Sequence, residues 1–354
     1  MYIGYNTDMN IEYASRLEKI EAVLASFLPA AADDNWMSAS FSVLPDAVRS
    51  VHLKTLLEPC RSLMLRGGKR WRPLLMVLSC ELAGGGERAI GLTPLVEFPH
   101  TASLIHDDIE DHAEERRGEP AVHLLYGEDT AINCASWLYF HTFSVIDSFP
   151  CSDSLKQDLY RLVSRELRRL HLGQAMDIHW HRNPSLIPSR SEYEAMVSLK
   201  TGTLSRLAAE AGMIAGGASI QDASFLGDIA ARIGVGFQVI DDVRNLATGN
   251  PGKKRGDDIV EGKKSLPVLM HVEKHPGDLP LLSSLFEQAR TDGINSPAVE
   301  RVIEMVQSSG ALDRAREYGI QCIESSTLSL RGRYHKSTAC ELLAGLFDTM
   351  REGL

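Results

Sequence analysis

The stretch LIHDDIED at residues 104–111 ends an apolar segment with a group of acidic side chains. At about 100° per residue, an α-helix places Asp107, Asp108 and Asp111 within an arc of roughly 100°, whereas Glu110 points elsewhere. The residues before this group are mostly apolar and follow a helical period, so the body of the helix should be buried. The pattern therefore predicts a buried helix that presents three carboxylates at its end.

Three acids on one helical face repel one another, by a few tenths of a kcal/mol for each like-charged pair one turn apart. A bound cation would offset that repulsion. Hard oxygen ligands without cysteine favour Mg²⁺, shared with a phosphate group. Taken alone, the group is equally compatible with a solvated acidic helix end.

The same spacing returns at Asp241, Asp242 and Asn245, after an apolar run that contains Phe237 and Ile240. Asn245 replaces the third acid, and its carbonyl oxygen can still bind a metal ion or a water. Two such acidic groups, each at the end of a buried helix, are unlike the solvated acidic residues of an ordinary protein surface. If they face each other, they predict metal ions and a diphosphate between them.

Residues 67–73, GGKRWRP, join a glycine pair to three cations ahead of an apolar segment. Lys69 and Arg72 share a helical face, glycine permits close approach of the backbone, and arginine offers two parallel donors to phosphate. Further basic residues lie near the acidic groups in the sequence, and each of them, taken alone, is more often a solvated surface residue than a phosphate ligand. They are Arg116, Arg117, Lys200, Lys253, Lys254, Lys263 and Lys264. Their recurrence favours diphosphate binding by cations and metals together. The pattern GxxxxGK[ST] is absent, which excludes a P-loop.

Helical periodicity covers nearly the whole chain, and alternating strand patterns are absent. The breaks are short and no repeat is found. The helices expected are 11–28, 46–66, 73–83, 94–111, 129–147, 154–178, 191–216, 222–246, 264–273, 296–308, 311–329 and 336–350. We predict an all-α fold, with a partly helical N-terminal extension over residues 1–45 and one large helical domain over residues 46–354.

Composition narrows the class of protein. The chain has 354 residues, of which 44% are apolar and 24% charged, as in globular proteins, and its net charge of −10 argues against a nucleic-acid partner. No two of the six cysteines have CxxC spacing, so no zinc or dithiol motif is present. The apolar runs are too short for a transmembrane segment, and the N-terminal residues do not resemble a signal peptide. We expect a cytoplasmic protein.

Seven motifs occur in a fixed order: GGKRWRP at 67–73, HTASLIHDDIED at 100–111, RRG at 116–118, GQAMD at 173–177, KTG at 200–202, FQVIDD at 237–242 and GKKRGDDIVEGK at 252–263. This set, spanning roughly residues 50–275, closely resembles the trans-isoprenyl diphosphate synthase family. Residues 131–133 ahead of Tyr139 and Phe140, and the run GQAMDIHW at 173–180, are most similar to eukaryotic-type geranylgeranyl diphosphate synthases. The DDxxN form of the second acidic group is also found there.

The resemblance implies the isoprenoid synthase fold, with antiparallel helices around a deep central cavity, in a protein that is usually a homodimer. It implies head-to-tail condensation of isopentenyl diphosphate with dimethylallyl, geranyl or farnesyl diphosphate, with release of diphosphate. The implied cofactor is Mg²⁺, for which Mn²⁺ can substitute.

The resemblance also implies a role for each matching residue. Asp107, Asp108 and Asp111 would hold Mg²⁺ on the allylic diphosphate, and Asp241 and Asp242 a further ion, with Asn245 a doubtful ligand. The residues that match the isopentenyl diphosphate site are Lys69, Arg72, His100 and Arg117. Those that match the allylic diphosphate site are Arg116, Lys200, Lys253 and Lys263. Thr201 and Gln238 would lie beside the reacting carbons, and Lys200 would also stabilise the departing diphosphate.

Product length is predicted from packing. Ala102 and Ser103, about one turn before Asp107, are small, which in this family implies a product longer than fifteen carbons. Tyr139, Phe140 and His171 resemble the floor that limits the chain in geranylgeranyl diphosphate synthases, although each also suits ordinary core packing. We predict a main product of twenty carbons.

Other functions remain open from the sequence. A class I terpene cyclase would not need Lys69, Arg72, His100 and Arg117, and a metal phosphohydrolase using His106 and Asp107 would leave the second acidic group unexplained. A longer-chain polyprenyl diphosphate synthase would share the same motifs. A non-catalytic subunit of a heteromeric synthase typically lacks one acidic group, whereas this chain keeps both.

Overall fold

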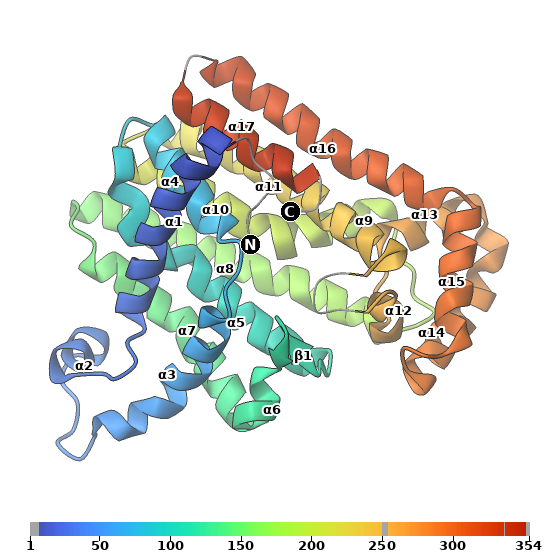
Figure 1. The fold of residues 1–354 in the computed structure, drawn as a ribbon, viewed down its shortest axis with the longest axis horizontal. Helices are drawn as coiled ribbons and strands as arrows, with labels where there is room; N and C mark the ends of the chain where they lie inside the picture. Colours follow the sequence, from blue (N-terminus) through green and yellow to red (C-terminus); the bar gives the residue numbers. More distant parts are fainter. Residues whose placement is uncertain (1–6, 250–253, 336, 352–354) are drawn as a thin grey trace. The chain divides into compact units, whose positions relative to one another are not determined.

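The computed structural model describes residues 7–249, 254–335 and 337–351. Helices make up nearly all of the secondary structure of these residues, which confirms the all-α prediction (Figure 1). The chain divides into two compact units, Met1–Arg165 with Leu207–Phe225 (unit 1) and Glu166–Arg206 with Leu226–Leu354 (unit 2). The divisions fall inside three helices: α8 (Asp153–His181), α10 (Thr203–Ala215) and α11 (Ile220–Ala247). These divisions lie within helices and not at a linker, and the single domain over residues 46–354 stays a prediction.

Unit 1 is built around the pairing of α5 with α7, and α3 also packs on α7. The N-terminal extension belongs to this unit, because α1 packs against α4, η1 and α5. Arg16 on α1 forms an ion pair with Glu81 on α4 at 2.7 Å. The helices that lie wholly in unit 1 are α1 (Thr7–Phe27), α2 (Asp34–Phe41), α3 (Ser50–Leu65), α4 (Trp71–Leu82), the 3₁₀ helix η1 (Gly86–Leu92), α5 (Pro94–Glu110), α6 (Val122–Tyr126) and α7 (Glu128–Ser148).

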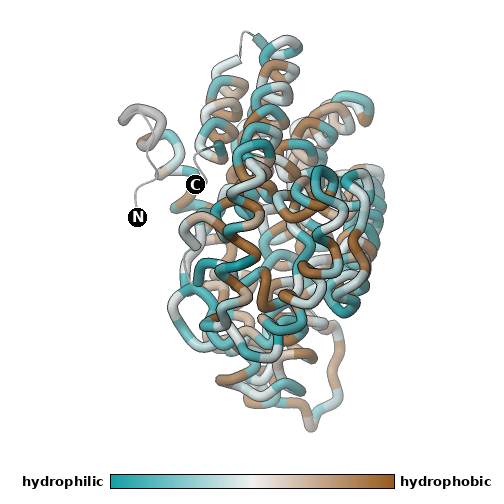
Figure 2. The backbone as a smooth tube through the Cα atoms, turned by 90° about the vertical axis from the view of Figure 1, so that its right-hand side faces the viewer, coloured by the Kyte–Doolittle hydropathy of each residue, from teal (hydrophilic) through white to brown (hydrophobic). Residues whose placement is uncertain are grey.

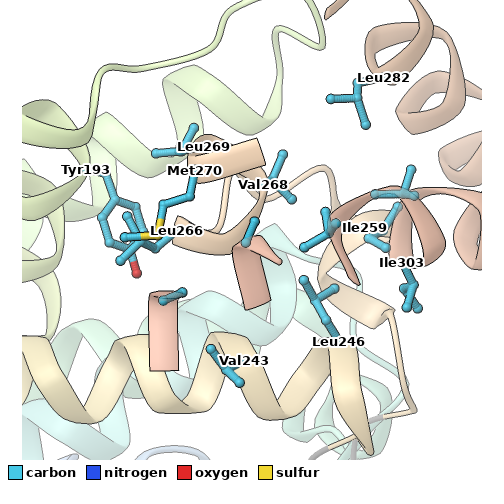
Figure 3. Packing of buried hydrophobic residues seen from close by; sticks show 14 of the residues in the cluster. Tyr193, Val243, Leu246, Ile259, Leu266, Val268, Leu269, Met270, Leu282 and Ile303 are labelled. Atoms are coloured by element: carbon cyan, nitrogen blue, oxygen red, sulfur yellow. The ribbon is translucent and has the colours of Figure 1, made fainter. Parts of the chain in front are cut away.

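Unit 2 has its own core, in which Val243 and Leu246 of α11 pack with Leu266 and Met270 of α13 and Ile303 of α15 (Figure 3). Helices α16 and α17 run side by side (Figure 1). The elements are α9 (Arg190–Val197), the π-helical segment η2 (Ser198–Gly202), α12 (Asp257–Glu261), α13 (Leu266–Lys274), the 3₁₀ helix η3 (Pro276–Asp278), α14 (Leu279–Asp292), α15 (Pro297–Ser308), α16 (Ala311–Tyr334) and α17 (Thr338–Arg351). Apolar and polar residues both recur from turn to turn along the helical parts of the chain (Figure 2), as expected of helices with one buried face.

Four of the described α-helices were not predicted, among them the five-residue α12, and one expected helix is interrupted. Helix α2 begins at the N-cap Asp33, which accepts a hydrogen bond from the Trp36 backbone N–H at 2.7 Å. Helix α14 contains Pro280 in its first turn, where proline is well tolerated. The five-residue helix α6 is too short to show a period. The continuous helix predicted over residues 191–216 instead contains the π-helical segment η2.

Helix α11 is the one described helix that is long and apolar enough to cross a membrane, with a mean hydropathy of 1.3 in its most apolar window. Of that window, 67% is buried inside the protein. The core helix of a globular protein has the same properties, so the helix is weak support for a membrane span.

Candidate active site

The first carboxylate cluster lies where α5 ends and comprises Asp107, Asp108 and Asp111. His112 has a φ of 53°, and the backbone N–H groups of His112 and Ala113 donate to the carbonyl oxygens of Ile109 and Asp108 at 3.3 and 2.8 Å. This is the Schellman arrangement, with histidine where glycine is usual. The cluster therefore sits at the negative end of the helix dipole, which strengthens the expected need for a cation.

Asp108 is held firmly within this cluster. Its side chain is 1% exposed, and its Oδ1 accepts a hydrogen bond from Nε of Arg116 at 2.7 Å. Its Oδ2 is buried and has no hydrogen-bond partner. Burial raises the pKa of Asp108 above its ordinary value, although Arg116 opposes the shift. An unpaired buried carboxylate oxygen of this kind suits a metal ligand.

Arg116 reaches Asp108 because the chain turns back in a small hairpin after α5. Strands β1 (Glu115–Arg116) and β2 (Glu119–Pro120) pair antiparallel. Arg117 and Gly118 between them have φ values of 58° and 79°, as a two-residue type I′ turn requires. The sequence analysis expected no strands, and two-residue strands are too short to show an alternating pattern.

Arg66, which the sequence analysis did not single out, fastens this hairpin to the end of α3. Its Nη1 donates to the carbonyl oxygens of Arg116 and Pro120 at 3.1 and 2.8 Å, and its Nη2 donates to Oγ of Ser62 at 3.0 Å. These partners are mostly backbone carbonyls that come together only in the fold, so no motif pointed to Arg66.

The cationic cluster comprises the residues predicted to bind isopentenyl diphosphate, Lys69, Arg72, His100 and Arg117. Nη1 of Arg72 lies 3.5 Å from Nε2 of His100. Burial lowers the pKa of Arg72 to about 10, with Glu97 opposing the shift and Arg117 adding to it. Burial and the charges of Arg72 and Arg117 hold the pKa of His100 well below its ordinary value. Because like charges in this cluster destabilise one another, the binding of an anion between them is favourable.

The glycine pair of the GGKRWRP motif lets Arg117 approach the loop backbone. Gly67 and Gly68 have φ values of 85° and 149°, which favour glycine. Nη1 of Arg117 donates to the carbonyl oxygen of Gly67. A Cβ atom at position 68 would lie 3.2 Å from Nη2 of Arg117. The motif thus supplies cations of its own and also provides the backbone loop against which the Arg117 guanidinium packs.

Arg70, the middle cation of this motif, is a buried structural residue. Its Nη1 donates to Oε1 of Glu97 at 2.5 Å, its Nε to Oε1 of Glu21 at 2.7 Å, and its Nη2 to the carbonyl oxygen of Met64 at 2.6 Å. These bonds hold its backbone in the left-handed region, at a φ of 46°, between Lys69 and Arg72. Because Glu21 lies on α1, the N-terminal extension supports the cationic cluster.

Replacing Glu97 by alanine should lower the free energy of unfolding by about 3–5 kcal/mol, because it deprives the buried Arg70 guanidinium of its buried partner. Urea unfolding measures the change. Glu87→Ala is the matched control, since it breaks an ion pair with Lys19 whose side chains are 51% and 46% exposed. That pair should contribute less than about 1 kcal/mol. Equal small losses in both variants would contradict the structural role of Arg70.

The second carboxylate cluster, Asp241 and Asp242, lies near the end of α11 in unit 2. Asp242 is 6% exposed, and its Oδ1 accepts from Nε2 of Gln238 at 3.0 Å. Its Oδ2 accepts from the Tyr193 hydroxyl at 2.6 Å and from the Leu266 backbone N–H at 3.2 Å. Burial raises the pKa of Asp242 to about 6, although these hydrogen bonds oppose the shift. Asp241 is only half-buried, so it is the more accessible of the two.

Asn245, predicted as a doubtful metal ligand, has partners in the turn that follows α11. Its side chain is completely buried, and its Oδ1 accepts a 3.4 Å hydrogen bond from the Asp258 backbone N–H. Its backbone carbonyl accepts from the Gly256 N–H at 3.0 Å. Asn245 therefore anchors the turn that leads into α12. The spacing of the acidic group placed it correctly on α11 but did not reveal which partner it faces.

Lys200 and Thr201 lie in the π-helical segment η2, a distortion that recurs at functional sites. Nζ of Lys200 donates to Oδ2 of Asp177 at 2.7 Å, and Oγ1 of Thr201 donates to Oε1 of Gln238 at 2.9 Å. Gly173, one turn before Asp177 on α8, packs against the η2 backbone. The sequence analysis gave Asp177 no role, although its spacing from Gly173 within the GQAMD motif was a usable signal.

The remaining predicted cations differ in their surroundings. Lys253 lies outside the described residues. Nζ of Lys263 lies 2.5 Å from Oε2 of Glu261. Lys264 is 3% exposed, and its Nζ lies 4.3 Å from the centre of the Phe286 ring. Burial lowers the pKa of Lys264 to about 8. Lys264 is thus a core residue, and Lys263 is the more accessible of the pair.

The residues predicted to set product length do not all line a buried space. Ala102 is completely buried, and Tyr139 on α7 stacks on His106 of α5, with ring centroids 5.8 Å apart. Burial and the charges of Glu110 and Asp107 raise the pKa of Tyr139. Tyr139 therefore lies beside the first carboxylate cluster.

The other three length residues have different positions. Oγ of Ser103 donates to the carbonyl oxygen of His100 at 2.9 Å. Phe140 is 73% exposed and His171 is exposed as well, so neither closes a cavity within this chain. Adjacent residues on a helix point in different directions, which separates Phe140 from Tyr139.

The carboxylates fit a metal ion that is shared with substrate. In the described part of the chain, no three His, Cys, Asp or Glu side chains converge closely enough to hold an ion by themselves. Mg²⁺ commonly takes one or two carboxylates and completes its shell with phosphate oxygens and water. The unpartnered Oδ2 of Asp108 and the more accessible Asp241 are such hard oxygen ligands.

A family model of the polyprenyl synthetases matches residues 53–305 of the chain. The geranylgeranyl pyrophosphate synthase of Eremothecium gossypii is 33% identical over 296 residues, covering 81% of this chain and 90% of the relative. The geranylfarnesyl diphosphate synthase of Aeropyrum pernix is 34% identical over 298 residues, covering 80% and 88%. The crystal structure of geranylgeranyl pyrophosphate synthetase from Pyrococcus horikoshii matches with a TM-score of 0.82 and 26% identity, over 98% of each chain.

Proposed function

The chain belongs to the polyprenyl synthetase family and is a prenyltransferase, and from this premise we propose that it makes geranylgeranyl diphosphate. It would condense isopentenyl diphosphate head-to-tail with an allylic diphosphate, which is dimethylallyl, geranyl or farnesyl diphosphate, and release diphosphate. The relatives bearing geranylgeranyl and geranylfarnesyl names support a product of this length class.

One observation supports this function above all: the chain has a cationic cluster distinct from its carboxylate clusters. Arg72 and Arg117 are half-buried. Burial lowers the pKa of each guanidinium, and like charges add to the shift: Arg117 acts on Arg72, and Arg70 and Arg116 act on Arg117. A second diphosphate bound without a metal would relieve that repulsion. A terpene cyclase or a phosphohydrolase has one phosphorylated substrate and does not need such a site.

Family members use divalent metal ions, and we propose Mg²⁺ for this chain, with Asp107, Asp108 and Asp111 as ligands in unit 1 and Asp241 as a ligand in unit 2. When bound, it would withdraw negative charge from the departing diphosphate. Arg116, Lys200 and Lys263 add positive charge for the same group, and Lys253 is proposed with them. Each fixed cation lowers the cost of charge that develops on the leaving oxygen.

The condensation balances without an added oxidant or reductant. The C1–O bond of the allylic diphosphate breaks, and its electron pair leaves with the diphosphate. The double bond of isopentenyl diphosphate then supplies two electrons for the new carbon–carbon bond, and a proton is lost to the released diphosphate. Thr201 and Gln238 present oxygen lone pairs that can stabilise the allylic cation, while the cationic cluster holds the second substrate in place.

The test of this function is a product assay on the purified chain. Isopentenyl diphosphate and Mg²⁺ are supplied with each allylic diphosphate in turn, and products are identified by mass spectrometry. We expect a twenty-carbon diphosphate from at least one starter. A hydrocarbon or alcohol formed without isopentenyl diphosphate would instead indicate a cyclase or a hydrolase, and no condensation with any starter would indicate a non-catalytic subunit.

Tyr139→Ala is expected to lengthen the product by at least one five-carbon unit, because it removes a ring that packs on His106 beside the first carboxylate cluster. An isoprene unit is about as long as one helical turn, roughly 5 Å, so one aromatic ring is a sufficient barrier. The product distribution is measured by mass spectrometry. Leu328→Ala on α16 is the control, since Leu328 is 68% exposed and lies outside both carboxylate clusters, so product length should not change. An unaltered distribution in Tyr139→Ala would remove Tyr139 from the length-setting residues.

We also propose that the chain forms a homodimer in the cytoplasm. Unit 1 exposes several large apolar side chains on α6 and α7, which suits contact with a second copy. They are Leu124, Leu125, Ile132 and Phe140.

A further inference from the structure

Four side chains of unit 2 form one continuous line of hydrogen bonds that ends on Thr201. Oγ1 of Thr201 donates to Oε1 of Gln238 at 2.9 Å, and Nε2 of Gln238 donates to Oδ1 of Asp242 at 3.0 Å. The Tyr193 hydroxyl donates to Oδ2 of Asp242 at 2.6 Å. The line therefore joins α9 and η2, which follow one another directly in the sequence, to α11, which is distant from both.

Donor and acceptor chemistry fixes the direction of this line. Asp242 is accepting at both oxygens, so the Gln238 amide must turn its NH₂ group toward Asp242 and its oxygen toward Thr201. The Thr201 hydroxyl hydrogen is then used on Gln238. Lone pairs remain on the oxygens of both side chains, and these are the atoms that could face an electron-deficient carbon. A reversed amide would set two acceptors against each other.

Tyr193 secures the far end. It is 1% exposed, so it does not contact substrate directly, and its ring packs beside Leu266 and Met270 (Figure 3). The Leu266 backbone N–H donates to the same Asp242 oxygen at 3.2 Å. Asp242 is thus held from the side of the core by one side chain and one backbone group, and it is poorly disposed to turn toward a metal ion.

We propose that Tyr193 is a positioning residue for the condensation, acting through Asp242 to fix the orientation of Gln238 and Thr201. The inference rests on the proposed function, because it assumes that Thr201 and Gln238 stabilise the allylic cation. It gives Asp242 the role of an anchor in place of the direct metal ligand predicted from the sequence, and leaves Asp241 as the metal ligand of the second cluster.

Tyr193→Phe tests this role, since it removes one oxygen atom and keeps the packed ring. The hydrogen bond it deletes ends on a buried carboxylate, so we expect kcat to fall about tenfold or more. The KM for isopentenyl diphosphate should stay within about twofold, because the cationic cluster is unaltered. Tyr160→Phe is the matched control. Tyr160 also donates to an aspartate, Asp147, but this hydrogen bond is exposed to solvent and lies outside both carboxylate clusters, so the kcat of the variant should equal that of the wild type.

A double-mutant cycle separates positioning from general stability. In a Gln238→Leu background the line is already broken, so Tyr193→Phe should have no further effect on kcat. An unchanged kcat in the single variant, or an equal loss in both backgrounds, would overturn the positioning role. If thermal unfolding shows that Tyr193→Phe is not folded, Asp242→Asn replaces it in the same cycle. A further loss of kcat on adding Asp242→Asn to the Gln238→Leu variant would overturn the anchor role of Asp242. A wild-type chain that forms no condensation product would overturn the proposed function. An active wild type combined with one of the contradicting results named above would overturn only this inference.

Discussion

Asp108→Asn is expected to lower kcat/KM for the allylic diphosphate by about 10³-fold while leaving the fold intact. The substituted amide has the shape of the carboxylate, and its oxygen can still accept the hydrogen bond from Arg116. The substitution changes the other oxygen of the carboxylate, Oδ2, which in the wild type is buried and has no hydrogen-bond partner. An NH₂ group there would repel a cation in place of binding it, and the lost charge stabilisation amounts to several kcal/mol.

Steady-state kinetics with a Mg²⁺ titration would measure this effect, and higher Mg²⁺ should recover part of the rate. The matched control is Glu115→Gln, an exposed acid in the hairpin that follows the same cluster. Its kinetics should be close to those of the wild type. Equal rates for wild type and Asp108→Asn, with both proteins folded, would show that the first carboxylate cluster does not act through this residue.

Gly173→Ala is expected to reduce kcat by about 10²-fold, because the added methyl group leaves no room for η2. A Cβ atom at position 173 would overlap the backbone nitrogen of Lys200 and lie 2.8 Å from the carbonyl carbon of Leu199. These are backbone atoms, so η2 must shift, and Lys200 and Thr201 shift with it. A displacement of about 1 Å at a catalytic group commonly costs about 10²-fold in rate.

The control for this variant is Gly332→Ala in α16, where a Cβ atom would meet nothing within 4 Å. That substitution should keep activity and raise stability by up to about 1 kcal/mol, as alanine favours the helix. For Gly173→Ala, thermal unfolding should show a modest loss of stability alongside the large loss of kcat. Full activity in this variant would mean that close packing of α8 on η2 is not required.

Spacing along single helices was the most predictable part of the site. The arc shared by Asp107, Asp108 and Asp111 follows from helical geometry, and the structure places them at the end of α5 as expected. The long amphipathic helices were predictable for the same reason. Helix α2 and the hairpin that holds Arg116 and Arg117 were not, because short elements have too few residues to show a period.

Roles that depend on partners from other elements were less predictable. Lys69, Arg70 and Arg72 are alike as sequence, yet Arg70 is enclosed by Glu97 and Glu21, whereas Arg72 approaches His100. Asn245 has the spacing of a metal ligand but faces the turn before α12. Phe140 resembles its neighbour Tyr139 in chemistry and differs in exposure.

The most direct test of the account is the mass of the product formed from farnesyl diphosphate and isopentenyl diphosphate by the purified wild-type chain, with Mg²⁺ and after its removal by EDTA. The account predicts a diphosphate one isoprene unit longer than the starter, of twenty carbons, that disappears with EDTA. Recovery of both substrates unchanged in the presence of Mg²⁺, or release of a farnesyl alcohol or hydrocarbon in place of a longer diphosphate, would contradict it.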